Sequence, residues 1–121
     1  MENAIIPFQT IDWSHVPRTE HKGETGLAYW KTMKCAGLRL RYVEYSANYK
    51  ADHWCEKGHI VYCLQGEVVN ELNNGTRSTL KKGMSYIVSD GLSEHRSMTQ
   101  NGVHLLIIDG AFLTPNPQPE P

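Results

Sequence analysis

Hydrophobic and polar residues alternate along most of the chain with a period close to two, and no convincing stretch has a period near 3.6. Successive side chains of a β-strand point to opposite faces of a sheet, so this alternation is typical of half-buried strands. The clearest example is LRLRYVEY, residues 38–45, which separates two sets of side chains: Leu38, Leu40 and Tyr42 on one face, Arg39 and Arg41 on the other. The pattern predicts an all-β fold.

Other apolar runs of strand length lie between turn signals. They are GLAYWKTM (26–33), HIVYCL (59–64), EVVNEL (67–72), MSYIV (84–88) and VHLLIID (103–109). In the segment ELNNGTRS (71–78), the Asn-Gly pair predicts a tight hairpin, because these residues accept the positive φ angles of such turns. Short strands at these intervals are typical of a β-sandwich or a β-barrel.

The length of 121 residues predicts one domain with one core. Residues 1–25 contain prolines and a glycine that interrupt any repeat, and they predict an irregular or edge-pairing N-terminal arm. Residues 26–113 form the predicted barrel. Residues 114–121, TPNPQPEP, are rich in proline and predict a flexible tail.

Composition excludes several classes of function. The formal net charge of −1 gives no basic surplus for a nucleic-acid backbone. The longest apolar run, HLLIIDGAFL, contains Asp109 and is shorter than the roughly 20 residues of a membrane-spanning helix. The N-terminus has no basic segment ahead of an apolar one, so we expect no secretory signal and a cytoplasmic location.

The segment KADHWCEKGHIVYCLQGE places two histidines and a cysteine, His53, Cys55 and His59, within seven residues. Alternation on a strand would turn His53 and Cys55 to the same side, and a bend at Lys57-Gly58 would aim His59 at the same point. Imidazole and thiolate are good ligands for borderline and soft transition metals. From these residues alone two interpretations remain, a metal site or a hydrogen-bonded cluster in a metal-free fold.

The remaining cysteines and histidines are assigned no ligand role. Cys63 lies in the apolar run IVYCL and is predicted to pack in the core, while Cys35 gives no signal in either direction. His104 alternates with Leu106 and Ile108, which is typical of a structural histidine on a strand.

A later segment, KKGMSYIVSDGLSEHRSMT (81–99), has a glycine that opens a strand, a Ser-Asp-Gly turn and then His95. Together with the earlier cluster, this order resembles the two motifs of the cupin superfamily. In the first motif, the two histidines, the glutamate and the closing glycine correspond to His53, Cys55, His59 and Gly66. In the second motif, the glycines, the proline and the expected histidine position correspond to Gly83 and Gly91, Ser89 and Glu94, and His95 follows one residue late.

The stretch YKADHWCEKGHIVYCLQGE, with HRS and the closing LLIID, is also similar to a small group of cupin-fold proteins with a DHWC-type motif. This resemblance spans residues 6–112. It implies a compact cupin-type β-barrel, also called a double-stranded β-helix or jelly roll, with a metal centre inside it. It does not imply a particular reaction.

The resemblance adds His95 to the ligand set His53, Cys55 and His59. Glu94 is the alternative fourth ligand, but alternation does not let both neighbours face inward, and we prefer His95 as the better donor for zinc. The cysteine and the third histidine replace harder ligands of the general motif. Softer ligands favour zinc as the divalent transition metal, with iron, nickel or copper as alternatives.

The number of ligands separates two functions. A metal with an open position can act as an enzyme centre on a small organic substrate, whereas a closed centre belongs to a non-catalytic module that binds a small molecule or senses metal. An exposed sheet edge and the apolar N-terminal arm predict a homodimer.

Overall fold

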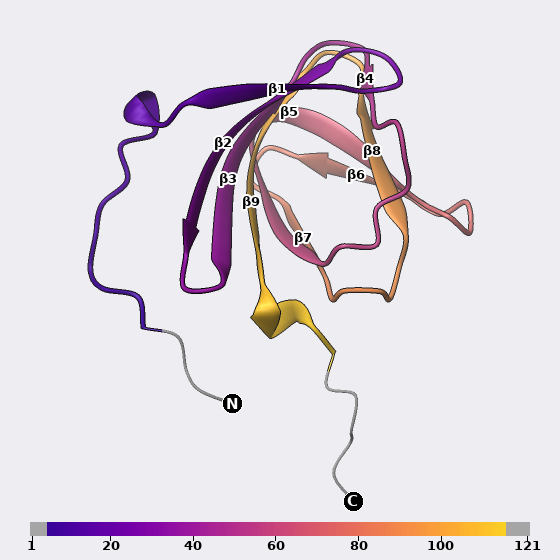
Figure 1. Cartoon of the computed structure of the whole chain (residues 1–121). Coiled ribbons are helices and arrows are strands. Elements are labelled where there is room, and N and C mark those ends of the chain that lie inside the picture. Colours follow the sequence, from indigo (N-terminus) through magenta and orange to yellow (C-terminus); the bar gives the residue numbers. More distant parts are fainter. Residues whose placement is uncertain (1–4, 116–121) are drawn as a thin grey trace, which may run out of the picture.

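The computed structural model describes residues 5–115 and folds them into two antiparallel sheets (Figure 1). Nine strands follow one another along the chain: β1 (Arg18–Lys22), β2 (Leu27–Cys35), β3 (Leu38–Tyr45), β4 (Tyr49–Lys50), β5 (His59–Leu72), β6 (Arg77–Lys81), β7 (Ser85–Val88), β8 (His95–Thr99) and β9 (Val103–Gly110). Two short 3-10 helices, η1 (Trp13–His15) and η2 (Ala111–Leu113), lie before the first strand and after the last.

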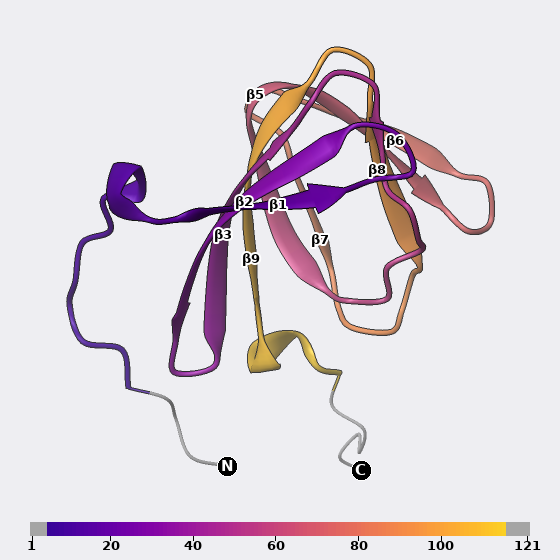
Figure 2. The ribbon, with the colours of Figure 1, turned by 45° about the horizontal axis from the view of Figure 1, so that its top comes forward.

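The long strand β5 belongs to both sheets. Its first half pairs with β9 and β7 in the sheet that continues through β3 and β2 to β1. Its second half pairs with β6 and β8, and β8 pairs in turn with β4. The two sheets curl around a common interior and form the barrel seen from a second side in Figure 2.

A change of register lets β5 pass from one sheet to the other. The pairing with β9 shifts between Cys63 and Gln65, and Gly66 follows with a φ angle of 82°. A Cβ atom at Gly66 would lie 2.5 Å from the carbonyl oxygen of Gly102, so only glycine fits this close approach of two strands.

The core fills the space between the two sheets. It is formed by buried aliphatic side chains and one cysteine: Val43, Val61, Cys63, Val68, Leu80, Val103, Leu105 and Ile107. These positions alternate with outward-facing ones along their strands, as the period of two predicts. The core lies beside the first residues of β5 and the last of β9, where the polar side chains described below begin.

The predicted fold class is confirmed, because the chain is an all-β barrel. The segment 38–45 forms β3 and residues 103–109 lie in β9, while the segment 71–78 forms the β5–β6 hairpin with Gly75 at a φ angle of 91°. The two runs at 59–64 and 67–72, predicted as separate segments, form one continuous strand. Cys63 lies in the core, as predicted.

The N-terminal segment contributes one edge strand. Residues of β1 pair antiparallel with β2, from Arg18 opposite Lys31 to Lys22 opposite Leu27. Of the predicted tail, residues 116–121 lie outside the described part of the chain, as do residues 1–4. Within residues 5–115, no helix has the length and apolar character needed to cross a membrane.

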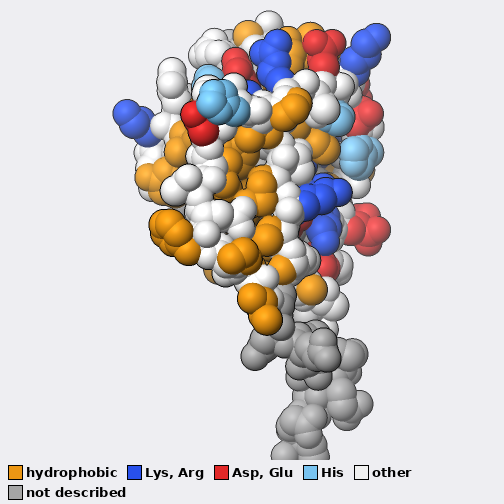
Figure 3. Space-filling view, turned by 60° about the vertical axis from the view of Figure 1, so that its left-hand side comes forward, with side chains coloured by type: hydrophobic (Ala, Val, Ile, Leu, Met, Phe, Trp, Pro, Cys, Tyr) orange, Lys and Arg blue, Asp and Glu red, His pale blue; other side chains and the backbone are white. Residues whose placement is uncertain are grey.

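The outer face of the larger sheet carries a row of apolar side chains across five strands. The pairing register places them opposite one another in the order Met33, Leu40, Ile108, Ile60 and Ile87. Ile87 is 76% exposed, and Phe8 in the N-terminal segment is 95% exposed. Figure 3 views the molecule from the side of the N-terminal segment, where hydrophobic side chains gather over a broad area.

Candidate metal centre

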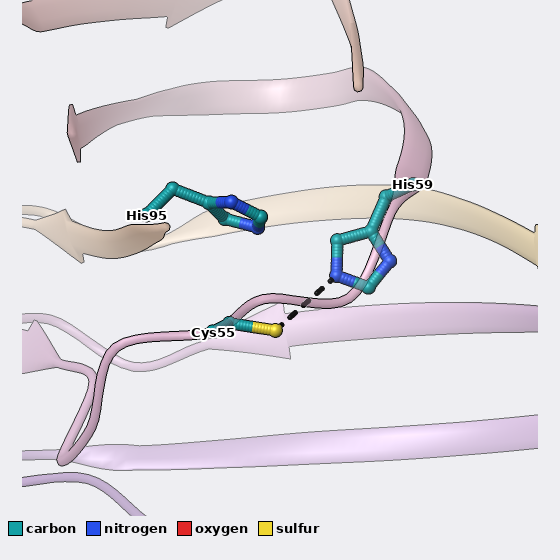
Figure 4. Close-up of side chains that lie close together, drawn as sticks. All are labelled: Cys55, His59 and His95. Atoms are coloured by element: carbon teal, nitrogen blue, oxygen red, sulfur yellow. Dashed lines mark hydrogen bonds between the residues drawn. The ribbon is translucent and has the colours of Figure 1, made fainter. Parts of the chain in front are cut away.

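Three side chains with metal-binding atoms meet inside the barrel: Cys55, His59 and His95. Their ligand atoms all lie within 4.8 Å of one another, and Figure 4 shows the thiol and both rings directed toward one point. His59 and His95 are 7% and 5% exposed. The three residues come from the loop before β5, the first position of β5 and the first position of β8.

An isolated β-bridge fixes Cys55 against His95. The Cys55 N–H donates to the His95 carbonyl at 2.8 Å, and the His95 N–H donates to the Cys55 carbonyl at 3.0 Å. Residues that exchange both hydrogen bonds in an antiparallel pair project their side chains on the same face. The thiol and the imidazole are therefore brought to one side by backbone pairing alone.

A glycine allows His59 to reach the same point. A Cβ atom at Gly58 would lie 2.6 Å from the backbone nitrogen of Asp90 and 2.7 Å from the carbonyl oxygen of Val88. The Gly58 N–H also donates to the Asp90 carboxylate at 2.6 Å. This close approach places the first residue of β5 against the end of β7, and the His59 side chain then points into the barrel.

In each of the two imidazole rings, the Nδ1 atom makes the hydrogen bond that fixes the ring. Nδ1 of His95 lies 2.8 Å from the Ser93 carbonyl oxygen, and Nδ1 of His59 lies 3.2 Å from Oδ2 of Asp109. A carbonyl and an ionised carboxylate can only accept, so each Nδ1 carries a proton and Nε2 is the ring nitrogen that remains for Cys55 or a metal. Nε2 of His59 lies 3.8 Å from the Cys55 sulfur.

Asp109 is itself fixed by two arginines of β3. Arg39 donates to both carboxylate oxygens at 2.9 Å, and Arg41 donates to Oδ2 at 3.1 Å. Burial alone would raise the pKa of Asp109, but the hydrogen bond and charge of Arg39, with the charge of Arg41, lower it. The carboxylate therefore stays ionised beneath the His59 ring.

The surroundings of Cys55 favour its thiolate form. The hydrogen bond with His59, and then the nearby ring of His95, outweigh burial and lower the pKa of this thiol to about 5. Burial would lower the pKa of His95, but its interactions with Cys55 and the Ser93 carbonyl raise it. A thiolate is the form of cysteine that binds metals and acts as a nucleophile.

A buried nitrogen without a hydrogen-bond partner also indicates that these residues suit a metal ion. Nε2 of His95 is buried and has no hydrogen-bond partner among the described residues. Buried polar atoms without partners are rare in folded proteins. In tetrahedral coordination, bonds of about 2.0–2.3 Å place sulfur and nitrogen ligands roughly 3.3–3.6 Å apart, so small side-chain rotations would let this group close on one ion.

His53 and Glu94, both considered as ligands from the sequence, lie outside this group. His53 is 73% exposed at its side chain, and its Nδ1 lies 2.6 Å from Oδ1 of Asp52. The alternation that would turn His53 toward Cys55 does not apply, because residues 51–58 form a loop whose only ladder pairing is the bridge at Cys55. Glu94 accepts a hydrogen bond from the Asn73 side chain at 2.7 Å.

Sequence reasoning missed the support beneath the centre. The alternation of LRLRYVEY was found, but it is the arginine face that points inward, and Arg41 is only 5% exposed. A signal was present in the sequence, since Asp109 is an acidic residue at the end of an apolar strand. A buried carboxylate needs cationic partners, and the two alternating arginines could have been matched with it.

A cavity of about 190 Å³ adjoins the three ligands. Aromatic and basic side chains line much of it, including Trp30, Tyr45, Tyr49, Tyr86, Arg39 and Arg41. The cavity is also lined by Cys55, His59 and His95, and by His53. The centre is therefore accessible to a small molecule, which is how ligand sites of this size are usually built.

Solved structures with the same architecture identify the fold. An RmlC-like cupin from Shewanella frigidimarina matches with a TM-score of 0.69 and 13% identity, over 84% of this chain and 89% of that one. An ectoine synthase from P. lautus gives 0.68 and 15%, over 85% and 78%. A polyketide cyclase from Streptomyces resistomycificus gives 0.67 and 17%, over 84% and 78%. This chain has the cupin fold.

The cupin fold agrees with the superfamily resemblance seen in the sequence. No protein-family model matches the sequence, and a search of curated proteins found no match. The narrower similarity to proteins with a DHWC-type motif therefore stays a prediction. The similar structures carry the names of different enzymes, so the cupin fold does not by itself select a reaction.

Proposed function

We propose that this cupin-fold protein is a metal-dependent enzyme that acts on a small organic molecule. Cys55, His59 and His95 would hold one divalent transition-metal ion at the inner end of the cavity. The observation that carries the proposal is the buried Nε2 of His95, which has no hydrogen-bond partner within residues 5–115. It lies beside a thiolate and a second imidazole whose Nε2 is directed to the same point.

The ligand atoms support zinc as the first choice of metal. One thiolate and two neutral imidazoles form a softer set than the oxygen ligands preferred by magnesium, calcium or manganese. Iron, nickel and copper accept the same ligands and are the alternatives. A bound ion of this kind would supply Lewis acidity, polarising a substrate oxygen or lowering the pKa of a bound water.

Three protein ligands support catalysis over a closed structural site. Structural zinc sites usually have four protein ligands, whereas catalytic sites keep one position for water or substrate. The cavity that the three residues line would let water or substrate reach such a position. Asp109 would keep the proton of His59 on Nδ1 and so hold its Nε2 ready for the metal, as carboxylates beside metal-binding histidines generally do.

Metal content tests this proposal directly. Protein purified without a histidine tag should contain about one transition-metal ion per chain by elemental analysis. Cys55→Ser and His95→Ala should each lose it, while His53→Ala is the matched control and should keep it. Cobalt-loaded protein should show a thiolate charge-transfer band that disappears in Cys55→Ser.

The same measurements define the failure of the proposal. Equal metal loss in His53→Ala would contradict the ligand set, and a metal-free, folded wild-type protein would favour a hydrogen-bonded structural cluster. A cobalt spectrum with four protein ligands and no change on adding small ligands would favour the non-catalytic binding module.

The apolar row on the outer sheet face supports a second proposal, that the protein is a homodimer. The row Met33, Leu40, Ile108, Ile60 and Ile87 presents an apolar strip to solvent at Ile87, and the N-terminal segment adds further exposed apolar side chains. Exposed apolar surface of this kind marks an association site in many proteins. The centre lies inside the barrel, so each subunit would carry a complete site.

A further inference from the structure

The cavity beside the centre has an excess of positive charge. Among residues 5–115, no aspartate or glutamate lines it, while four basic residues do: Arg39, Arg41, Lys57 and Arg96. Two of the four have acidic partners outside the cavity wall. Arg96 donates to Glu71 at 3.0 Å, and the Lys57 ammonium lies 3.9 Å from Asp90.

The other two, Arg39 and Arg41, share one carboxylate. Asp109 accepts from both guanidinium groups and is only 2% exposed. Asp109 can balance only one of these two cations, and the thiolate of Cys55 in the same cavity wall makes no hydrogen bond with either arginine within residues 5–115. A buried charge without a full partner is costly in free energy, so this arrangement favours a second anion at the same place.

Arg41 is the residue with donors to spare. Within the described chain its guanidinium makes one side-chain hydrogen bond, from Nη2 to Asp109, and its Nε has no partner. The group lies over the Trp30 ring, with 4.6 Å between its central carbon and the ring centroid. Packing on Trp30 and pairing with Asp109 hold the guanidinium in place in the cavity wall, where its remaining N–H groups can donate to an anion.

We infer that Arg41, with Arg39 beside it, binds the carboxylate of a small organic acid in this cavity. Resting on the proposed function, this makes the substrate of the metal centre a carboxylate. The cavity of about 190 Å³ has room for an acid of a few carbon atoms.

Arg41 and His59 contact the same buried carboxylate. Oδ2 of Asp109 lies 3.1 Å from Nη2 of Arg41 and 3.2 Å from Nδ1 of His59. The arginine and the ligand histidine therefore lie on either side of one oxygen atom, and both line the same cavity. An acid held by Arg41 would direct its remaining groups toward the open side of the metal centre, where positioned reactants gain most from binding.

The test compares acids with their uncharged amides. Acetate, glycolate, oxalate and malonate, with acetamide and glycolamide, are titrated into metal-free and zinc-loaded protein by calorimetry. At least one acid should bind ten or more times tighter than the amides in both forms, because charge-assisted hydrogen bonds are stronger than neutral ones. This comparison needs no variant.

Variants then assign the effect to Arg41. Arg41→Gln should weaken acid binding at least tenfold in the metal-free protein, and Arg41→Lys should recover part of it. Arg18→Gln is the control: it removes the same charge from an arginine that packs on Tyr29 and does not line this cavity, so it should leave acid binding unchanged. Zinc content and far-UV spectra are measured for each variant.

The outcomes separate this inference from the proposed function. Acids that bind no better than amides, or bind Arg41→Gln as well as wild type, overturn the anion site. If acid binding is lost when zinc is removed but is unchanged in Arg41→Gln, the anion site is overturned and the metal proposal stands. If the wild-type protein takes up no transition metal when one is supplied, but binds acids and loses this binding in Arg41→Gln, the anion site is supported and the metal enzyme is contradicted.

Discussion

Oδ2 of Asp109 lies 3.2 Å from Nδ1 of His59, although the two residues are 50 positions apart in the sequence. Asp109 is near the end of β9 and His59 is the first residue of β5, and these strands pair side by side. The carboxylate fixes the proton on Nδ1 and thereby leaves Nε2 to face Cys55. One contact between two strands thus sets which nitrogen of the ring is available to a metal.

Asp109→Asn should weaken both metal binding and folding. The amide keeps the shape of the side chain but removes the charge that Arg39 and Arg41 share. Losing one partner of a buried ion pair costs about 3–5 kcal/mol in the free energy of unfolding. Loss of the group that orients a ligand histidine typically lowers metal affinity about 10–100-fold. Urea denaturation of metal-free protein and competition with a chelator measure the two effects.

Asp52→Asn provides the matched control for that experiment. Asp52 also accepts from a histidine, His53, at 2.6 Å, but both side chains are mostly exposed. Its replacement should change the free energy of unfolding by less than about 0.5 kcal/mol and leave zinc affinity unaltered. Asp109→Asn with wild-type zinc affinity would show that the carboxylate does not orient His59.

Cys55 should remain reactive in mildly acidic solution. In metal-free protein its pKa is lowered to about 5, so the thiolate predominates above that pH. Alkylation by iodoacetamide at Cys55 should be nearly independent of pH from about 8 down to 6 and decline through 5. An ordinary thiol with a pKa of about 8.5 would lose reactivity roughly tenfold per pH unit over this range. Peptide mapping by mass spectrometry identifies the labelled cysteine.

The same shift predicts a pH-dependent contribution to stability. Because the pKa of Cys55 is lower in the folded than in the unfolded chain, the unfolded state binds more protons between these two values. The stability advantage of wild type over Cys55→Ser should therefore be fully present above about pH 8.5 and be lost as the pH falls through about 5.

His95→Ala should move the alkylation profile to higher pH, and His53→Ala should not. A wild-type profile with the slope of an ordinary thiol would refute the thiolate.

Much of the fold could be predicted from alternation and turns. LRLRYVEY is β3 without any shift of boundary, and the Asn-Gly turn forms the β5–β6 hairpin. The short strands β4 and β8 were missed, since two residues carry no period and HRSMT has almost no apolar alternation. These strands form through pairing with distant partners, and local sequence contains little information about such pairing.

The site was predicted less completely, for a geometric reason. The sequence singled out Cys55, His59 and His95 because cysteine and histidine are chemically distinctive, and the structure brings these three side chains together, while their role as ligands stays a prediction. His53 was included by assuming a regular strand, whereas the loop before β5 turns its side chain toward Asp52. The inward face of Arg39 and Arg41 follows from Asp109 on β9, a partner about 70 residues away. Periodicity identifies two faces of a strand but not which one is buried.

The proposed homodimer predicts that Ile87→Asp yields a monomer. Ile87 is 76% exposed and ends the apolar row, so the charge should scarcely affect folding of one subunit but should oppose burial in an interface. Light scattering after gel filtration measures the mass. Leu92→Asp is the control, since Leu92 is 68% exposed and lies outside the row. A wild-type monomer, or a dimer that persists in Ile87→Asp, would contradict this interface.

Gly58→Ala should disturb the centre from outside its ligands. The added Cβ would meet the Asp90 nitrogen at 2.6 Å and the Val88 oxygen at 2.7 Å, and both are backbone atoms that cannot rotate away. Pushing the loop that contains residue 58 away from the end of β7 should lower the free energy of unfolding by about 1–3 kcal/mol. It should also displace His59, the next residue, and so weaken zinc binding, measured by chelator competition.

Gly75→Ala separates this contact from the general effect of replacing a glycine. Gly75 has a φ angle of 91°, and no atom lies within 4 Å of the place that an added Cβ would take, so its substitution carries only backbone strain. That strain is roughly 1–2 kcal/mol. Gly75→Ala should therefore destabilise the hairpin and keep wild-type zinc affinity, because the added Cβ would push against no described atom. If both variants lost zinc equally, metal binding would depend on overall stability, and the close passage of Gly58 beneath Asp90 would have no specific part in placing His59.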